Sequence, residues 1–238
     1  MQNIAIITAA GSGKRLGGST KKQYLELGGK PLLYYTIRQF EAHPAIESIV
    51  LVAPQDDLEY VRQEIVEQFG FHKIIKIIAG GQERQDSIFN ALQSLADYPA
   101  ETRLLIHDGV RPFITSDVLD AVIEKLKQSI STVVGVRVKD TIKEIDSDIY
   151  TQTLDRSRLI AVQTPQAFTL GLLAACYNLA QKENFYSTDD AALVEKYGLQ
   201  SVHLTAGSYF NIKITTAEDL IFAEAILNSL RENSCYHL

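Results

Sequence analysis

Cysteine is scarce in this chain, whose 238 residues include two, Cys176 and Cys235. Two thiols so far apart in the sequence provide neither the disulfide framework of a small secreted domain nor the ligand spacing of a zinc site. The composition therefore fits the reducing cytosol, and we expect a cytoplasmic protein.

Long apolar runs and an excess of positive charge are missing as well. No stretch approaches the roughly 18 consecutive apolar residues that a membrane-spanning helix requires. The chain goes directly from Met1 into the first expected strand, without the basic segment and cleavage site of a secretory signal. The formal net charge is -6, so no general positive field attracts nucleic acid. We expect neither a membrane nor a nucleic acid as a partner.

What the chain does contain is an alternation of short aliphatic runs with helical segments. With 46% hydrophobic residues, its length suffices for one large α/β domain, which we take to span 1–238. Repeated strand–helix units with right-handed crossovers predict a doubly wound, mostly parallel sheet of the Rossmann type, with ligands at the carboxyl ends of its strands. The expected strands are residues 3–8, 48–53, 73–79, 103–107, 132–138 and 201–204, and the expected helices are 32–43, 57–69, 85–95, 116–129 and 215–232.

Residues 139–158 interrupt this alternation. They are polar, and the turn-like Asp146-Ser147-Asp148 separates flanks rich in Ile, Thr and Tyr. This pattern predicts a β-hairpin outside the main sheet, because a structureless loop of that length is unusual in a compact domain. We expect a protruding β-arm that reaches a second subunit, with a solvated loop as the alternative.

The clearest functional signal follows the first expected strand. The run Thr8-Ala9-Ala10-Gly11-Ser12-Gly13 is small and glycine-rich, so backbone N–H groups can approach a polyphosphate closely. It matches neither a P-loop nor the dinucleotide fingerprint, whose third glycine is replaced by Leu16. An ordinary strand-to-helix turn is the alternative. A nucleoside triphosphate is favoured because four cations lie close together: Lys14, Arg15, Lys21 and Lys22.

Two further motifs follow later strands. Gly80-Gly81-Gln82-Glu83-Arg84 opens a helix and allows flat approach of a base or ribose, or is simply a strand-to-helix turn. In the motif His107-Asp108-Gly109-Val110-Arg111, Asp108 is placed to hold a ribose hydroxyl or Mg²⁺ bound to phosphates. The alternative is an Asp108–Arg111 ion pair that closes a turn. We expect His107 to be half-buried and not to carry protons.

Nine motifs in order along the chain resemble the 2-C-methyl-D-erythritol 4-phosphate cytidylyltransferases, nucleotidyltransferases of non-mevalonate isoprenoid synthesis. The resemblance extends from residue 3 to about 226 and is closest to the monofunctional form. It is carried by residues 9–15, 22–24, 80–84, 107–112, 139–143, 155–156, 163–166, 188–190 and 211–215.

The resemblance implies a reaction in which the phosphate of the sugar alcohol attacks the α-phosphorus of CTP and releases pyrophosphate, with Mg²⁺ held mainly by the triphosphate. It implies that Arg15 and Lys22 stabilise the transition state and that Arg156 and Lys213 position the attacking phosphate. It also implies a homodimer in which the 139–158 arm is exchanged between subunits.

The resemblance assigns the remaining site residues as follows. Substrate binding falls to Arg111 and Thr141 together with Arg156 and Lys213, and Asp108 lies near the metal. Lys21 occupies a position where the family commonly has proline, so the fixed φ of a proline ring is missing before Lys22. Nucleotide binding falls to Ala9, Ala10, Gly11, Ser12, Gly13, Lys14, Gly81, Gln82, Ser87, Asp108 and Gly109.

Three other functions are compatible with parts of the sequence. A ribitol-5-phosphate cytidylyltransferase of teichoic acid synthesis shares much of the site, although Thr188-Asp189-Asp190-Ala191 is more typical of the methylerythritol enzymes. An NADP-linked short-chain reductase needs Tyr-x-x-x-Lys on one helical face. Tyr209 and Lys213 have that spacing, but the apolar alternation across 210–214 predicts a strand instead. A catalytically silent binding protein is the third alternative.

Overall fold

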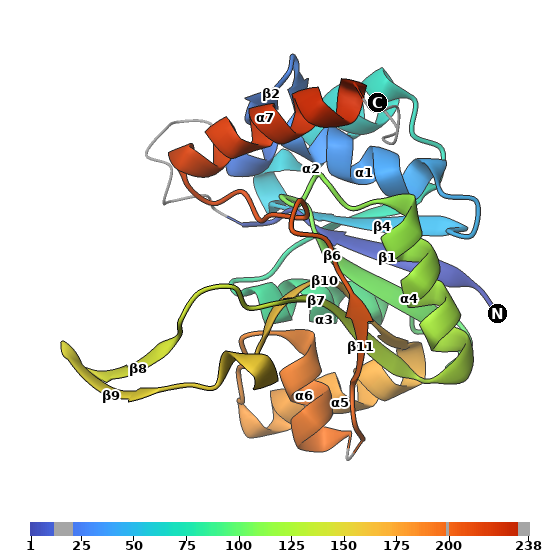
Figure 1. Ribbon diagram of the computed structural model, residues 1–238. Helices are drawn as coiled ribbons and strands as arrows, with labels where there is room; N and C mark the ends of the chain where they lie inside the picture. The colour runs from blue at the N-terminus through green and yellow to red at the C-terminus, as the bar shows by residue number, and fades with distance from the viewer. Residues whose placement is uncertain (12–20, 199, 233–238) are drawn as a thin grey trace.

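A seven-stranded sheet forms the centre of the structure, a computed structural model that describes residues 1–11, 21–198 and 200–232 (Figure 1). The strands lie in the order β11-β7-β10-β6-β1-β4-β5. They are β1 (Asn3–Thr8), β4 (Ser48–Ala53), β5 (Ile74–Ala79), β6 (Arg103–Asp108), β7 (Ser131–Arg137), β10 (Ile160–Thr169) and β11 (His203–Ala206).

The sheet is mostly parallel, as predicted. β1 pairs in parallel with β4 and β6, β4 with β5, and β7 with β11. β10 is the exception, because it lies between β6 and β7 and runs antiparallel to both. The carboxyl ends of β1, β4 and β6 therefore meet at one edge, where the sequence places its phosphate-binding motifs.

Helices cover both faces of the sheet, which confirms the doubly wound arrangement. Along β1, Ile4 and Ile6 pack in one apolar cluster and Ala5 and Ile7 in the other, so successive side chains supply opposite faces. The first cluster includes α3 (Arg84–Ser94), α5 (Leu170–Glu183) and α6 (Asp190–Tyr197). The second includes α1 (Leu32–Ala42), α4 (Ser116–Gln128), α7 (Ala217–Glu232) and the helix formed by α2 (Leu58–Tyr60) and the π-helical η4 (Val61–Glu67).

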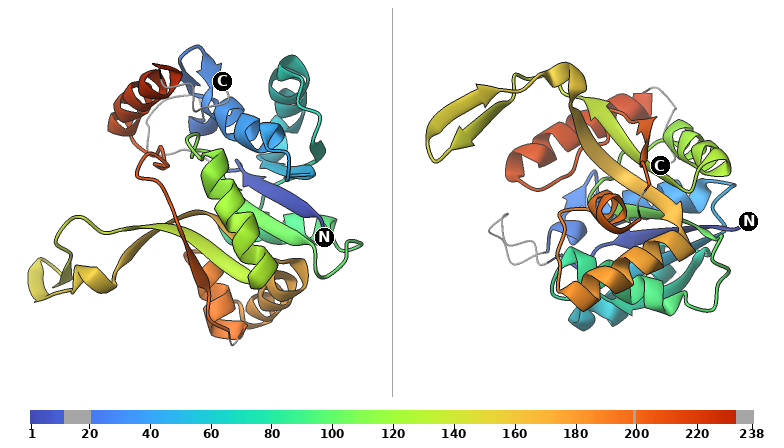
Figure 2. Two further views of the ribbon diagram at one scale, coloured as in Figure 1. Left: turned by 45° about the vertical axis from the view of Figure 1, so that its right-hand side comes forward. Right: turned by 90° about the horizontal axis from the view of Figure 1, so that it is seen from below.

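The predicted arm is present as a hairpin of β8 (Lys143–Asp146) and β9 (Ile149–Thr153). Its turn contains Ser147, whose φ is 55°. Figures 1 and 2 show the hairpin projecting from the body of the molecule. Its side chains Ile145, Ile149 and Tyr150 are 60%, 72% and 73% exposed, so the arm has apolar surface that its own chain leaves uncovered.

Several elements escaped the sequence-based prediction, and the strand expected across residues 210–214 is absent. β10, α5 and α6 were not expected, nor was the short hairpin of β2 (Glu26–Leu27) and β3 (Lys30–Pro31). Residues 210–214 form no strand, contrary to the alternating pattern, because Ile214 N–H donates to the carbonyl of Val110 (3.0 Å) in a loop and not to a strand. β11 begins two residues later than expected.

Within the described ranges, no helix combines the length and the apolar character needed to cross a lipid bilayer. Cys176 is buried in α5 without a disulfide; Cys235 lies outside the described residues.

His107 near the end of β6 is fully buried, not half-buried as expected. Its Nε2 donates to the carbonyl of Arg111 (3.0 Å), and its Nδ1 pairs with the hydroxyl of Thr164 (3.0 Å). The Thr164 oxygen also accepts the backbone N–H of Asp108 (3.1 Å), so a neutral imidazole with its proton on Nε2 satisfies all three groups. Burial lowers the pKa of His107 to about 4. With both ring nitrogens occupied, His107 serves as a structural link between β6 and β10.

This buried imidazole should make stability pH-dependent. The unfolded chain protonates His107 near its ordinary pKa of about 6.5, whereas the folded protein resists protonation down to about 4. The stability that His107 contributes is complete above about 6.5 and is lost as the pH falls. Between pH 7 and pH 5 we expect the free energy of unfolding to fall by about 2 kcal/mol more in the wild type than in His107→Gln. Urea titrations at both pH values measure it, with the exposed His203→Gln as control; equal losses in wild type and His107→Gln would contradict it.

Candidate active site

A cavity of about 310 Å³ opens at the carboxyl ends of β1 and β6. This is the edge at which doubly wound sheets bind ligands. Its lining comes from five places in the sequence, namely residues 8–11, Lys22 with Gln23, residues 81–84 with Ser87, Asp108 with Val110, and Lys213.

The loop after β1 forms one wall of this cavity. Ala9 N–H donates to the carbonyl of Val52 (2.7 Å), which continues the ladder between β1 and β4. A Cβ added at Gly11 would lie 3.6 Å from Cε of Lys22, so the aliphatic part of Lys22 lies beside the loop backbone. Ala9, Ala10 and Gly11 line the cavity together with Lys22, so the structure brings these candidate residues to one place. The other predicted loop residues, Ser12, Gly13, Lys14 and Arg15, lie outside the described residues.

The amino terminus of α3 forms the opposite wall. The side chains of Glu83 and Asp86 form a reciprocal capping box there, and Gly81 N–H donates to Ser87 Oγ (3.0 Å). The paired glycines are required by close packing: a Cβ at Gly80 would lie 2.2 Å from Cβ of Ala10, and one at Gly81 would lie 2.2 Å from Cβ of Asp86. The glycine pair therefore brings α3 against the loop after β1, and Gly81, Gln82 and Ser87, which we expect to bind nucleotide, line the cavity.

Asp108 lies at the centre of a cluster of three cations. Its Oδ2 is 3.0 Å from Nζ of Lys213 and 3.2 Å from Nε of Arg111, and its Oδ1 is 3.4 Å from Nε of Arg84. Burial alone would raise the pKa of the Asp108 carboxyl, but Arg84, Lys213 and Arg111 outweigh this effect and hold that pKa well below its usual range. The ion pair with Arg111, offered above as an alternative to a ligand role, is therefore present, within a larger cluster. The backbone N–H of Arg111 also donates to the carbonyl of Asp108 (3.0 Å), and this hydrogen bond closes the turn.

Arg84 was missed as a site residue although the resemblance included it in a motif. Its Nη2 lies 2.8 Å from Oδ2 of Asp190, a carboxylate with no solvent exposure. The hydroxyl of Tyr177 donates to the other oxygen of Asp190, and Gln166 Oε1 accepts the backbone N–H of Asp190 (3.0 Å). Arg84 thereby links the first turn of α3 to the start of α6 and to Asp108.

A second cavity of about 250 Å³ adjoins the first. Arg84, Asp108 and Lys213 line both cavities and form the wall between them, which we call the shared wall. The remaining lining of the second cavity was only partly anticipated from the sequence. Arg111 was predicted to bind substrate, and the others are Val162, Gln163, Thr164, Gln166, Thr188 and Asp189.

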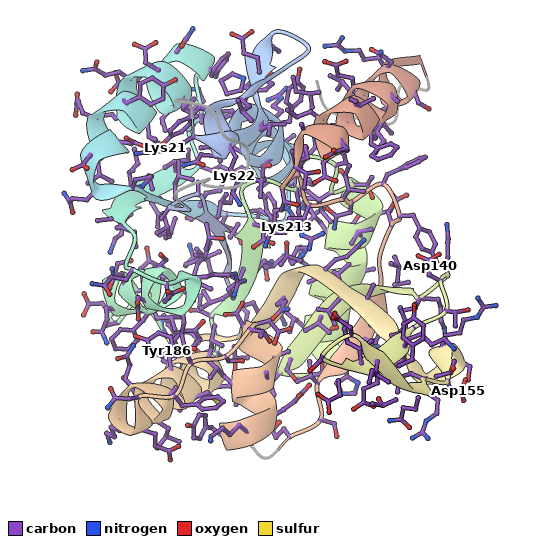
Figure 3. All side chains as sticks on the ribbon, turned by 90° about the vertical axis from the view of Figure 1, so that its left-hand side faces the viewer. Lys21, Lys22, Asp140, Asp155, Tyr186 and Lys213 are labelled. Atoms are coloured by element: carbon purple, nitrogen blue, oxygen red, sulfur yellow. The ribbon has the colours of Figure 1, made fainter. Side chains whose placement is uncertain are left out.

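Three predicted residues lie elsewhere. Gly109 does not line the first cavity, and its backbone N–H donates to the carbonyl of Thr8 (2.9 Å). Thr141 and Arg156 lie on the exposed arm, line neither cavity, and Arg156 Nη1 donates to the carbonyl of Lys139. In Figure 3 the arm residues Asp140 and Asp155 lie well away from Lys22 and Lys213. Within one chain, the arm does not complete the site.

Tyr209 and Lys213 do not form the pair that a reductase needs. Neither residue is in a helix; the hydroxyl of Tyr209 donates to the carbonyl of Arg137 (2.8 Å) at the base of the arm, whereas Lys213 pairs with Asp108. Lys139 Nζ lies 3.5 Å from the centre of the Tyr209 ring. Tyr209 therefore anchors the arm.

Comparison with known proteins agrees with this geometry. The profile of the family described as IspD, 2-C-methyl-D-erythritol 4-phosphate cytidylyltransferase, matches residues 3–229. The enzyme of that name from Geotalea uraniireducens is 45% identical over 230 residues, covering 97% of this chain and 98% of its own. The one from Halalkalibacterium halodurans is 43% identical, with 95% and 97% covered.

Solved structures of similarly named enzymes also resemble this chain. The 4-diphosphocytidyl-2C-methyl-D-erythritol synthase of Anaerococcus prevotii superposes with a TM-score of 0.83 at 37% identity, covering 95% of this chain and 96% of its own. The 2-C-methyl-D-erythritol 4-phosphate cytidylyltransferase of Francisella tularensis superposes with a TM-score of 0.80 at 29% identity, covering 95% of this chain and all of its own.

The link between Arg84 and Asp190 should be strongly stabilising. Arg84→Ala would leave Asp190 buried without its cation, so we expect the free energy of unfolding to fall by about 3 kcal/mol. The matched control is Arg62→Ala, which removes an exposed pair with Glu59 (3.7 Å) and should cost less than about 1 kcal/mol. Urea unfolding of both variants measures the difference. If both variants lost a similar free energy of unfolding, the buried pair would contribute no more to stability than the exposed pair.

Proposed function

The chain belongs to the 2-C-methyl-D-erythritol 4-phosphate cytidylyltransferase family, and on that premise we propose how its residues carry out the reaction. The enzyme joins CTP to 2-C-methyl-D-erythritol 4-phosphate, giving 4-diphosphocytidyl-2-C-methyl-D-erythritol and pyrophosphate in non-mevalonate isoprenoid synthesis. The observation that supports the assignment of roles is the pair of adjoining cavities with cations on their shared wall. One cavity takes the nucleotide, the other the polyol phosphate, and the phosphates meet at the wall.

CTP occupies the first cavity in this proposal. Residues 9–11 with Gly81, Gln82 and Ser87 surround the base and ribose, and Lys22 faces the triphosphate. The family resemblance implies that Ser12, Gly13 and Lys14 also bind the nucleotide and that Arg15 stabilises the transition state. Amide donors at a glycine-rich turn and at a helix amino terminus suit such an anion.

The polyol phosphate occupies the second cavity. Arg111 and Lys213 bind its phosphate, and Thr188 and the amides of Gln163 and Gln166 are available to its hydroxyl groups. Both cations already face a carboxylate, Asp108. The two cationic side chains are therefore already oriented when the phosphate binds, and they need less rearrangement.

The chemical step needs positioning and charge neutralisation. A phosphate oxygen of the polyol attacks the α-phosphorus of CTP in line, a new P–O bond forms, and the bond to the bridging oxygen of pyrophosphate breaks. The attacking phosphate is already ionised, so no general base is required, and His107 keeps its structural role. Lys22 and Arg15 neutralise the charge that develops on the α-phosphate and the leaving group, while Lys213 holds the nucleophile.

We propose Mg²⁺ as the cofactor, held mainly by the triphosphate. In the described ranges no three His, Cys, Asp or Glu side chains gather as a metal cluster, and both oxygens of Asp108 already face cations. Mg²⁺ commonly uses one or two carboxylates plus substrate phosphates, so this site fits a metal that arrives with CTP and lies near Asp108. When bound, it supplies charge neutralisation at the phosphates.

The whole chain, 1–238, acts in this proposal as one nucleotidyltransferase domain that pairs through the 139–158 arm into a homodimer. Thr141 and Arg156 then serve the site of the partner subunit. The exposed apolar side chains of β8 and β9 support this arrangement, because an isolated two-stranded hairpin is only marginally stable.

Acceptor choice tests the assignment of the second cavity. We expect pyrophosphate release with Mg²⁺, CTP and 2-C-methyl-D-erythritol 4-phosphate, and at most a small fraction of that rate with ribitol 5-phosphate. A coupled pyrophosphate assay with both acceptors side by side measures the ratio. Preferential turnover of ribitol 5-phosphate would reverse the assignment.

Mixed dimers test the exchange of the arm. Lys22→Ala and Arg156→Ala should each lose most activity alone. A dimer with one subunit of each type contains one site with both wild-type residues if Arg156 acts across the interface. Co-refolding equal amounts should therefore restore about a quarter of wild-type activity, since half of the dimers are mixed and one of their two sites is intact. If Arg156 acts within its own chain, mixing restores nothing.

A further inference from the structure

Lys22 is presented by a very short element. It is the first residue of η2 (Lys22–Tyr24), a single 3₁₀ turn whose backbone hydrogen bonds run from Tyr24 N–H to the carbonyl of Lys21 (2.9 Å) and from Leu25 N–H to that of Lys22 (3.2 Å). One turn of 3₁₀ helix has little stability of its own. The backbone position from which Lys22 projects therefore depends on what holds the two ends of the turn.

Asp57 holds both ends. It follows β4 at the end of the short 3₁₀ turn η3 (Gln55–Asp57), and Nζ of Lys21 lies 2.7 Å from each of its carboxylate oxygens. The Tyr24 hydroxyl donates to Oδ2 of the same carboxylate (3.0 Å). The side chain of Asp57 is 17% exposed and that of Lys21 34%, so water screens this pair only in part.

Tyr24 is suited to remain a donor. Its ring packs edge to face on Tyr60 at 5.0 Å, and burial together with the neighbouring Asp57 raises its pKa well above the ordinary value. The hydroxyl stays protonated at any physiological pH. In Figure 3 Lys22 lies between Lys21 and Lys213, on the side of the turn that faces the first cavity.

We propose that Asp57, through Lys21 and Tyr24, is the positioning residue that aims Lys22 into the nucleotide cavity. The backbone of Lys21 has φ -65° and ψ 141°, and that φ is the value which a proline ring would impose covalently. In this chain the ion pair between Nζ of Lys21 and both carboxylate oxygens of Asp57 restrains the backbone of Lys21 instead. The inference rests on the role given to Lys22 above, but it concerns a carboxylate that lines neither cavity.

The first test compares Asp57→Asn with Asp56→Asn, the neighbouring exposed acid. A small misplacement of a catalytic group can cost up to about 100-fold in rate, so we expect Asp57→Asn to lower kcat about 10-fold or more. The KM for CTP should change much less, because the lining of the base and ribose is untouched. Asp56→Asn should match the wild type. A kcat for Asp57→Asn within twofold of the wild type would overturn the proposal.

The second test is rescue. Lys21→Pro in the Asp57→Asn background replaces the lost ion pair with a covalent restraint on the same φ, and should recover most of the lost kcat. Lys21→Met in the wild-type background should reproduce the defect of Asp57→Asn. An equally low kcat in the double variant would show that Asp57 acts otherwise than by fixing this backbone, and would overturn the proposed mechanism.

Lys22→Ala, measured in parallel, separates this inference from the proposed role of Lys22. If Lys22→Ala retains kcat, the role of Lys22 is wrong. If Lys22→Ala is impaired while Asp57→Asn behaves as the wild type, the role of Lys22 stands and only the positioning proposal fails.

Discussion

The charge on one buried carboxylate organises the candidate active site. Asp108 is 5% exposed and ends the central strand β6, and Arg84, Arg111 and Lys213 all point at it. Three cations in so small a space would repel one another if the carboxylate were neutral. Because they come from α3, the loop after β6 and the segment before α7, the attraction to Asp108 also joins three distant parts of the chain. The fold therefore has its cationic wall in place before any phosphate binds.

The antiparallel strand β10 supports this arrangement from behind. Its pairing shifts register between Val162 and Gln166, and at this irregularity the hydroxyl of Thr164 meets both Asp108 N–H and His107. The carbonyl of Thr164 accepts from Asn211 (2.8 Å), whose own carbonyl accepts from Arg111 (2.9 Å). Lys213 follows two residues later. The position of this lysine is thus determined by hydrogen bonds to β10 and to the loop after β6 and does not need regular secondary structure.

The elements that were predicted correctly are those with an unambiguous apolar pattern. β1 and β4 are continuous aliphatic runs, and α4 has one clear apolar stripe. β10 was missed because Pro165 and the polar Gln163 and Thr164 interrupt it. In α5, Leu, Ala and Cys residues occupy most faces, so no single stripe marks the helix. Residues 210–214 alternate like a strand, but the backbone N–H groups of Asn211, Ile212 and Ile214 donate to carbonyls in loops, a fact that local sequence does not contain.

The residues of the candidate site also differ in whether the sequence alone indicates them. Gly81 and Asp108 stand in motifs at strand ends, Lys22 stands in the cation-rich segment after the first strand, and Ser87 came from the family resemblance alone; all four line the first cavity. Arg84 resembles a solvated base in the first turn of a helix, and its partner Asp190 is 106 positions away. Asp57 could not be recognised from sequence either, since its importance comes from Lys21 and Tyr24, which approach it across the fold.

The shared wall also sets a requirement for inhibitors. A molecule long enough to fill both cavities must pass Arg84, Asp108 and Lys213. An uncharged linker would bury these side chains without giving the cations a new anionic partner, and the desolvation penalty would reduce the affinity gained from the two ends. A linker with a phosphonate or sulfonate at its centre would give Lys213 and Arg84 an additional anionic partner. The chemistry of the junction, more than the fit of either end, therefore decides whether a bisubstrate ligand gains from its size.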